Sequence, residues 1–259
     1  MLKLFTRKPA GHVRDSIALD LGNGRTVDVV RVRHPRARSL KLSVDERGIR
    51  LTLPVRASQA AADRFLLAHR EWLRARLEEL ALAHVEPLRP FVTARLPLRG
   101  DWLPVEWSRG TSNRVHLADG VLHMQVRGAV DGMHASPALR RALQDFYMAE
   151  ARADIARWLP DYLPDLPRAP TRITLKRMVS QWGSLSPAGV VALDLALVLA
   201  HPSAFRYVLV HELCHILHPD HSRAFWDAVD TRFPDWRDER AWFARDGRSL
   251  KATLHALLD

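Results

Sequence analysis

Residues 211–221 read His-Glu-Leu-Cys-His-Ile-Leu-His-Pro-Asp-His, and the fold that we expect follows from them. His211 and His215 are four positions apart, so a helix would present both imidazoles on one face, one turn apart. At that spacing two ring nitrogens can reach one Zn²⁺ at about 2.0–2.1 Å. Glu212 is rotated away from that line, where a carboxylate can take a proton from water without binding the metal. The stretch therefore predicts a metal-hydrolase site on a helix.

The surroundings of this motif predict a buried helix rather than a solvated one. Ser203 is the expected N-cap, and apolar residues flank the histidines. They are Phe205, Val208, Leu209, Val210, Leu213 and Ile216. Burying two histidines and a glutamate is costly unless they gain partners, because unpaired polar groups lose their water. We favour a metal as that partner over a core of hydrogen-bonded histidines.

Two histidines and one glutamate compete as the third metal ligand. His218 continues the helical face of the first two ligands, but three ligands in one line cannot form a tetrahedron. Pro219 disfavours helical geometry at the residue before it, so the chain is expected to turn there. That turn would bring His221 back to the metal from another direction, and we favour His221. Glu239 is the alternative, although its Arg-rich context indicates a surface ion pair. His218 is then a candidate substrate contact or an exposed loop residue.

The first half of the chain has the pattern of β structure with one helix. Residues 16–56 alternate between apolar and polar positions around the turn Gly22-Asn23-Gly24, which predicts a hairpin. A helix is expected over 58–80, and short strands over 91–127. With 259 residues, one large domain or two smaller ones fit the length. We expect a basic, β-rich N-terminal region with one helix at 1–130.

The second half carries the predicted site. The stretch 128–137 is rich in glycine and alanine and is the expected boundary. Beyond it we expect the catalytic domain at 134–259. Its further expected elements are a helix over 136–158, strands over 172–176 and 190–195, and a last helix over 225–233.

The charge of the chain is uneven. Lys and Arg number 39 against 29 Asp and Glu, a net charge of +10, and residues 1–58 contribute an excess of eight positive charges. Arg31 with Arg33, and Arg36 with Arg38, would each share a strand face. We favour a solvated strand edge that resists aggregation. The alternative is a surface that docks on nucleic acid.

Cysteine usage and hydropathy indicate a cytoplasmic chain with no membrane partner. Cys214 is the one cysteine, which excludes a disulfide framework and fits a reducing compartment. Its place between two ligand positions favours a small buried hydrophobe over a metal ligand. The first residues have no apolar stretch long enough for a signal peptide. No run approaches the about 18–20 apolar residues that span a bilayer.

The motif and its neighbours resemble a known family. Residues 211–226, in the form HELxHxxxxxHSxxFW, together with Trp182-Gly183-Ser184, are similar to the YgjP-like metallopeptidases, relatives of the SprT-like and WLM zincins. The resemblance implies an α+β fold, with the motif helix of a zincin-like domain beside a small mixed sheet. It implies Zn²⁺ as the cofactor, with the zinc ligands His211, His215 and His221 and the general base Glu212.

The resemblance also bears on substrate contacts. In zincins the strand ahead of the motif helix can hold an extended peptide, and here that strand would include Trp182–Ser184 or residues 190–195. Trp182, Gly183 and Ser184 are therefore candidate substrate contacts with His218, although Trp182 fits plain core packing equally well. A developing oxyanion needs a hydrogen-bond donor. The candidate donors are Arg177 and Tyr207, together with His218 and the backbone near Trp182.

Three function classes stay open. The leading one is a zinc-dependent peptidase acting on protein or peptide substrates, including proteins bound to nucleic acid. The second is a metal-dependent nucleotide phosphohydrolase of the pyrophosphatase type, which no glycine-rich phosphate loop supports. The third is a DNA- or protein-binding module with a vestigial metal site. The intact Glu212 counts against the third, since a structural site needs no base.

Overall fold

The chain folds into two compact α+β units, residues 1–84 and 85–259. The computed structural model describes residues 14–22, 24, 26–45, 48–82, 86–128, 134–179 and 181–259. The α+β class expected from the sequence is confirmed. The division falls before the strands of 95–127 rather than at 128–137, a stretch of which residues 129–133 lie outside the described part. The reason is packing, because those strands share one hydrophobic core with the C-terminal helices.

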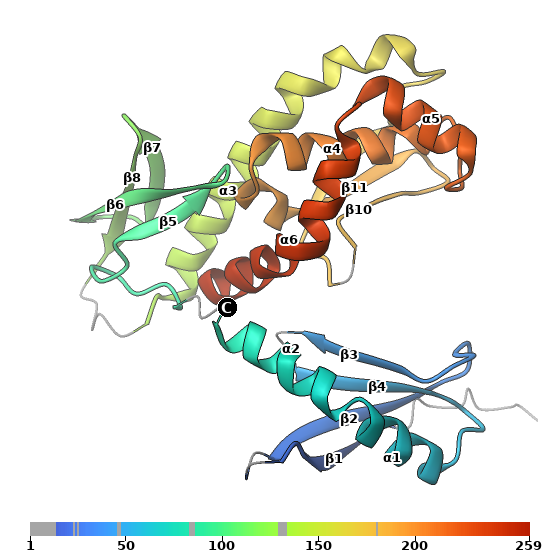
Figure 1. The fold of residues 1–259 in the computed structure, drawn as a ribbon. Helices are drawn as coiled ribbons and strands as arrows, with labels where there is room; N and C mark the ends of the chain where they lie inside the picture. The colour runs from blue at the N-terminus through green and yellow to red at the C-terminus, as the bar shows by residue number, and fades with distance from the viewer. Residues whose placement is uncertain are drawn as a thin grey trace, which may run out of the picture. The chain divides into compact units, whose positions relative to one another are not determined.

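The first unit is a four-stranded sheet covered on one face by two helices (Figure 1). Its elements are β1 (Arg14–Asp20), β2 (Thr26–His34), β3 (Lys41–Asp45), β4 (Gly48–Pro54), α1 (Gln59–Ala68) and α2 (Arg70–Leu82). β1 and β2 form the predicted antiparallel hairpin. Gly22 and Gly24 of its turn have φ of 85° and 72°, which favour glycine, and Asn23 lies outside the described residues. β2 pairs in parallel with β4, which gives the order β1-β2-β4-β3.

The single helix expected over 58–80 is two helices. Ser58 caps α1 as predicted, its hydroxyl accepting a hydrogen bond from a first-turn N–H at 3.2 Å. The break comes at His69, which leaves helical geometry and places its Nδ1 2.8 Å from the carbonyl oxygen of Phe65. The helices and the sheet share a core of Leu19, Val29, Ile49, Leu51, Leu53, Ala62, Leu66 and Leu73.

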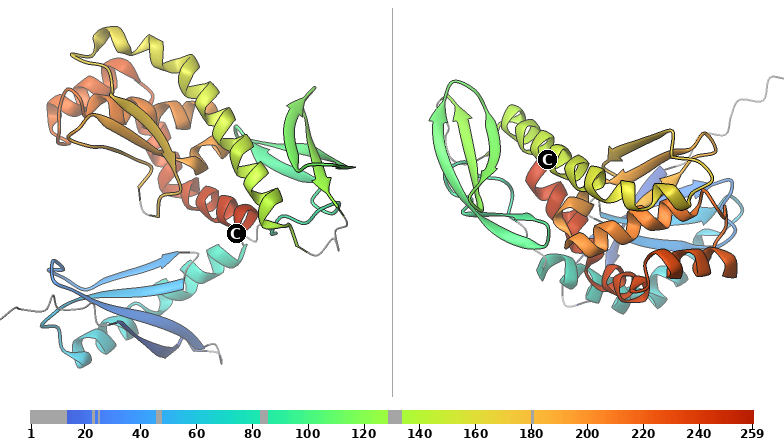
Figure 2. Two further views of the ribbon diagram at one scale, coloured as in Figure 1. Left: turned by 180° about the vertical axis from the view of Figure 1, so that it is seen from behind. Right: turned by 90° about the horizontal axis from the view of Figure 1, so that it is seen from above.

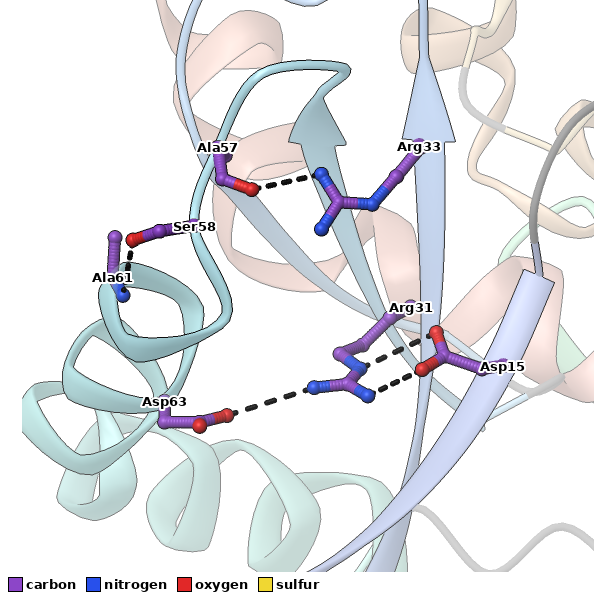
Figure 3. Close-up of polar contacts among 7 residues, drawn as sticks. All are labelled: Asp15, Arg31, Arg33, Ala57, Ser58, Ala61 and Asp63. Atoms are coloured by element: carbon purple, nitrogen blue, oxygen red, sulfur yellow. Dashed lines mark hydrogen bonds and ion pairs between the residues drawn. The ribbon is translucent and has the colours of Figure 1, made fainter. Parts of the chain in front are cut away.

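Arg31 and Arg33 hold α1 and the loop before it against the sheet (Figure 3). Arg31 is 5% exposed, donates to both carboxylate oxygens of Asp15, and lies 3.6 Å from Asp63 of α1. Arg33 donates to the carbonyl oxygen of Ala57 at 2.8 Å. The expectation of a solvated strand edge is wrong for these two residues, because β2 lies between β1 and β4 inside the sheet.

Replacing Arg31 is expected to destabilise the first unit. Arg31→Met removes both ion pairs, and its cost should be about 2 kcal/mol, below that of a fully buried pair because the two aspartates are half-exposed. Hydrogen exchange of the β2 and α1 amides should then be about 30-fold faster. Arg36→Met, at an exposed position after β2, is the matched control and should change exchange less than about threefold. Equal effects of the two substitutions would contradict this role for Arg31.

The second unit contains two sheets. Strands β5 (Arg95–Leu98), β6 (Asp101–Gly110), β7 (Arg114–Ala118) and β8 (Val121–Arg127) have the order β5-β6-β8-β7. Strands β9 (Arg172–Lys176), β10 (Gly183–Leu185) and β11 (Val190–Asp194) have the order β10-β11-β9. β11 is antiparallel to β10 and parallel to β9, so the predicted small mixed sheet is present and β10 lies at its edge.

Helices surround these sheets. They are α3 (Pro137–Trp158), α4 (Pro202–Cys214), α5 (Arg223–Arg232) and α6 (Trp236–Leu258), with three short 3₁₀ segments, η1 (Leu159–Asp161), η2 (Leu163–Asp165) and η3 (Leu195–Leu199). α3 begins after its N-cap Ser136, within the helix expected over 136–158, and lies beside the β5–β8 sheet in both views of Figure 2. α4 begins at Pro202 after His201, not after the expected Ser203, because proline suits the first helical turn. No helix among the described residues is long and apolar enough to cross a membrane.

The 23-residue helix α6 has no counterpart in the sequence prediction, which ended the last helix at Phe233. Pro234 ends α5, and the polar residues that follow, with Gly247 among them, gave little sign of a long helix. Gly247 is explained by packing. A Cβ there would lie 2.9 Å from Cζ2 of Trp182, so glycine lets α6 approach the loop before β10.

Candidate metal centre

Helix α4 positions the first two histidines and the glutamate. Its apolar residues are fully buried, as the sequence predicted: Leu209, Val210, Leu213 and Cys214 are each 0% exposed. The helix ends at Cys214, and His218 is no longer helical, as expected from Pro219. The chain then returns through His221, immediately before Ser222, the N-cap of α5. The turn thus brings His221 back to the helix.

The three predicted histidines converge. His211, His215 and His221 each offer a ring nitrogen, and these atoms all lie within 4.8 Å of one another. The Nε2 atoms of His211 and His221 are 3.0 Å apart. Nδ1 of His215 lies 3.1 Å from the carbonyl oxygen of His218, which leaves Nε2 of His215 for a ligand. No other group of three His, Cys, Asp or Glu residues in the described ranges meets this distance.

The chemistry of these histidines fits a divalent metal such as zinc. Burial, helped by the charges of His215, His221 and Arg240, lowers the pKa of His211 to about 3. Burial also lowers the pKa of His215. Both imidazoles are therefore neutral at pH 7, which is the form that binds a metal. Nδ1 of His211 is buried without a hydrogen-bond partner in the described part of the chain. Neutral nitrogens this close to one another are a donor set that zinc prefers.

Glu212 lies buried beside the histidines and under β10. Glu212 is only 5% exposed, and this burial raises the pKa of its carboxyl group to about 8. Gly183 lies directly against it. A Cβ at Gly183 would be 2.5 Å from Oε1 of Glu212, so a larger residue on this strand would displace the carboxyl group. The sequence singled out Gly183 as a substrate contact, and the structure places it as a neighbour of Glu212.

Trp182 and Ser184 flank this glycine. The half-buried ring of Trp182 packs 4.8 Å from the ring of Phe243 on α6, and Nζ of Lys251 lies 4.4 Å from its centre. In these contacts Trp182 packs within the protein, as one of its two expected roles requires. Ser184 is half-buried in the edge strand β10, opposite Ala192.

A buried ion pair that the sequence did not predict holds the loop before β10. Nζ of Lys251 donates to Asp194 at 2.6 Å and to the carbonyl oxygens of Met178 and Gln181 at 2.8 and 2.7 Å. Asp194 is 1% exposed and also accepts from the N–H of Met178 at 2.9 Å. The one signal in the sequence was an aspartate inside the apolar stretch 190–200.

The two candidate oxyanion donors, Tyr207 and Arg177, lie in different surroundings. Tyr207 lies one turn before His211, with ring centres 6.0 Å apart. Burial raises the pKa of Tyr207 to about 12, the charge of Arg240 opposes that rise, and the charges of Glu212 and Glu239 add to it. The phenol of Tyr207 is therefore protonated at pH 7 and can donate a hydrogen bond. Arg177 is engaged by Asp259 at the end of α6, at 2.7 Å, so the structure does not bring it together with the histidines.

Glu239, the alternative third ligand, is bonded to a histidine outside the converging group. Its Oε2 is 2.8 Å from Nε2 of His201. The expectation of a surface ion pair is wrong, because Glu239 is only 8% exposed. It is also not a member of the histidine group. The turn at Pro219 explains the difference, since it gives that position to His221.

Three aromatic residues, Phe225, Trp226 and Trp236, form a wall beside the histidines. Phe225 stacks on His215 with ring centres 4.5 Å apart, and Trp226 stacks on His221 at 5.7 Å. Trp236 stacks on the ring of Trp226 at 4.4 Å. We call this set the aromatic wall. Phe225 and Trp226 are the last two residues of the family motif at 211–226 and fall in the helix expected over 225–233, whereas Trp236 lies beyond both.

Comparisons with known proteins identify a family and one similar solved structure. The family described as "YgjP-like, metallopeptidase domain" matches residues 38–246, which include the three histidines, Glu212 and the aromatic wall. A solved structure, "Crystal structure of the metallopeptidase zymogen of Pyrococcus abyssi abylysin", is similar at 20% identity and a TM-score of 0.30, covering 39% of this chain and 95% of that chain. No curated protein matches. Because the family match spans most of the sequence, the chain belongs to the YgjP-like metallopeptidase family.

Proposed function

We propose that the chain is a zinc-dependent peptidase whose zinc is held by His211, His215 and His221. The proposal rests on one observation. Three ring nitrogens converge within 4.8 Å beside a buried carboxyl group, Glu212, that is not one of them. A structural metal site has no use for such a carboxyl group, whereas a hydrolase needs it as a base. Membership of a metallopeptidase family supports the same reading.

In the proposed hydrolysis, Glu212 and Tyr207 have different roles. Zinc held at this position would supply Lewis-acid activation of water and of a carbonyl group. Glu212 takes a proton from the attacking water and passes it to the leaving amine. Burial raises the pKa of this carboxyl group to about 8, so it holds a proton more readily than an exposed glutamate does. Tyr207 would donate a hydrogen bond to the developing oxyanion.

The edge strand β10 is the proposed substrate-binding strand. It pairs with β11 on one side only, and extended peptides add to such edges through backbone hydrogen bonds. Gly183 of this strand contacts the carboxyl group of Glu212. A peptide paired with β10 would therefore run past the base. This arrangement favours a polypeptide over a nucleotide as the substrate.

Nucleic acid is proposed as a partner of the first unit rather than as the substrate. Arg31 and Arg33 do not contribute, because they are bonded inside the unit. Exposed cations that support the proposal are Arg36, Arg38, Lys41 and Arg50. Five other basic residues of this region, Lys3, Arg7, Lys8, Arg25 and Arg47, lie outside the described residues. Such a surface would bring the enzyme to proteins bound on nucleic acid.

One comparison of substrates tests the proposal. The zinc-loaded full chain is incubated with an unfolded protein, with and without duplex DNA, and separately with nucleoside triphosphates. We expect new peptide N-termini by mass spectrometry and no release of phosphate. Phosphate release without peptide cleavage would overturn the peptidase in favour of a phosphohydrolase. Cleavage that DNA does not change would remove the nucleic-acid partner and leave the peptidase.

A further inference from the structure

Arg240 lies on α6 beside the aromatic wall. It is one helical turn after Trp236, and its guanidinium carbon lies 5.1 Å from the centre of the Trp226 ring and 6.0 Å from that of Trp236. Trp226 in turn stacks on His221, one of the converging histidines. The wall therefore fixes a positive charge next to the candidate zinc ligands.

Neighbouring arginines have acceptors within the fold, whereas no described residue accepts a hydrogen bond from the guanidinium group of Arg240. Arg237 donates to Asp230 at 2.7 Å, and Arg232 donates to the carbonyl oxygen of Ala228 at 3.1 Å. Arg240 is exposed, and in the described part of the chain it forms ring contacts but no ion pair with a carboxylate. Stacking uses the face of a guanidinium group and leaves the N–H donors at its edge available.

The charge of Arg240 also acts on the site. It is among the causes that lower the pKa of His211, and it opposes the burial-driven rise in the pKa of Tyr207. The guanidinium group is thus close enough to both residues for its field to reach them. A substrate group that binds Arg240 would lie near the histidines as well.

We propose that Arg240 binds a carboxylate of the peptide substrate and so positions the bond to be cleaved. This inference rests on the proposed peptidase function. A guanidinium group can bind a carboxylate through two parallel hydrogen bonds, which fixes direction as well as distance. The carboxylate would come from an acidic side chain or from the C-terminus of the peptide. Arg240 acts as a positioning residue for specificity, and the chemistry stays with Glu212.

Binding without turnover tests this inference directly. In the zinc-loaded 259-residue chain carrying Glu212→Gln, the affinity is measured for blocked peptides that differ only in one Glu or Gln. A second pair differs only in a C-terminal carboxylate or amide. We expect one carboxylate peptide to bind about tenfold more tightly than its neutral partner, and the pair that shows it identifies the source. Adding Arg240→Gln should reduce that preference to about one, and Arg240→Lys should restore part of it.

Arg237→Gln is the matched control, because Arg237 stacks on Trp236 yet is paired with Asp230. It should keep the full preference. The inference is overturned if Arg240→Gln weakens all peptides equally, which is the sign of a structural role in the wall. It is also overturned if no peptide binds or if no pair shows a preference. Failure of the peptidase function is a separate result, in which the wild-type chain binds the preferred peptide but does not cleave it.

Discussion

Glu212→Gln is expected to lower the rate of polypeptide cleavage by about 10³-fold while zinc stays bound. Glutamine has the shape of glutamate, so it should keep the contact that this side chain makes with Gly183. It cannot take a proton from water, so the base is lost and the fold is kept. The metal should remain because Glu212 is not one of the converging ligands. Rate and zinc content are to be measured on the same sample.

Glu239→Gln is a matched control for this substitution. Glu239 is also a buried glutamate of the second unit, but it is bonded to His201 and stands outside the histidine group. Its replacement should change the rate less than about tenfold, an effect smaller than the loss of a general base. A Glu212→Gln protein that cleaves at the wild-type rate, or that loses its zinc, would contradict the role given to Glu212.

His221→Ala is expected to weaken zinc binding by more than about 100-fold, since even the loss of a partner outside the ligand shell costs up to that much. Its ring nitrogen is one of the three within 4.8 Å, and two histidines on one helix cannot complete a tetrahedral site alone. Competition with a zinc-binding dye measures this affinity. Peptidase activity should fall together with zinc content.

His218→Ala separates the two histidines that compete for this role. The bond from His218 to His215 uses the backbone carbonyl oxygen, which alanine keeps. Zinc affinity should therefore stay within about threefold, well below the loss of an outer partner. If His218→Ala lost zinc and His221→Ala kept it, the ligand assignment would be reversed.

Much of the site could be predicted because its determinants are local. The spacing of His211 and His215 needs only a helix, and the turn back to His221 needs only Pro219. Hydrophobic residues at helical spacing around the motif predicted a buried helix, and α4 is one. Likewise, the turn at Gly22 and the alternation around it predicted the β1–β2 hairpin.

Features that depend on distant parts of the chain could not be predicted. Arg31 was assigned to a strand edge because no local pattern shows that β4 pairs beside β2. The place of Glu239 depends on contact between α6 and the start of α4, 38 residues away in sequence. Arg240 reaches the site only because α6, a helix missed in the sequence, stacks it on Trp226. Tertiary packing, rather than local preference, decides each of these positions.

We propose that this chain cleaves polypeptides with zinc held by three histidines beside Glu212. The decisive experiment is to titrate zinc into the metal-free chain and to measure cleavage of an unfolded protein. We predict no cleavage before zinc is added and a rate that rises until one zinc per chain is bound. Cleavage by the metal-free protein, or none after one equivalent of zinc is bound, would contradict the claim.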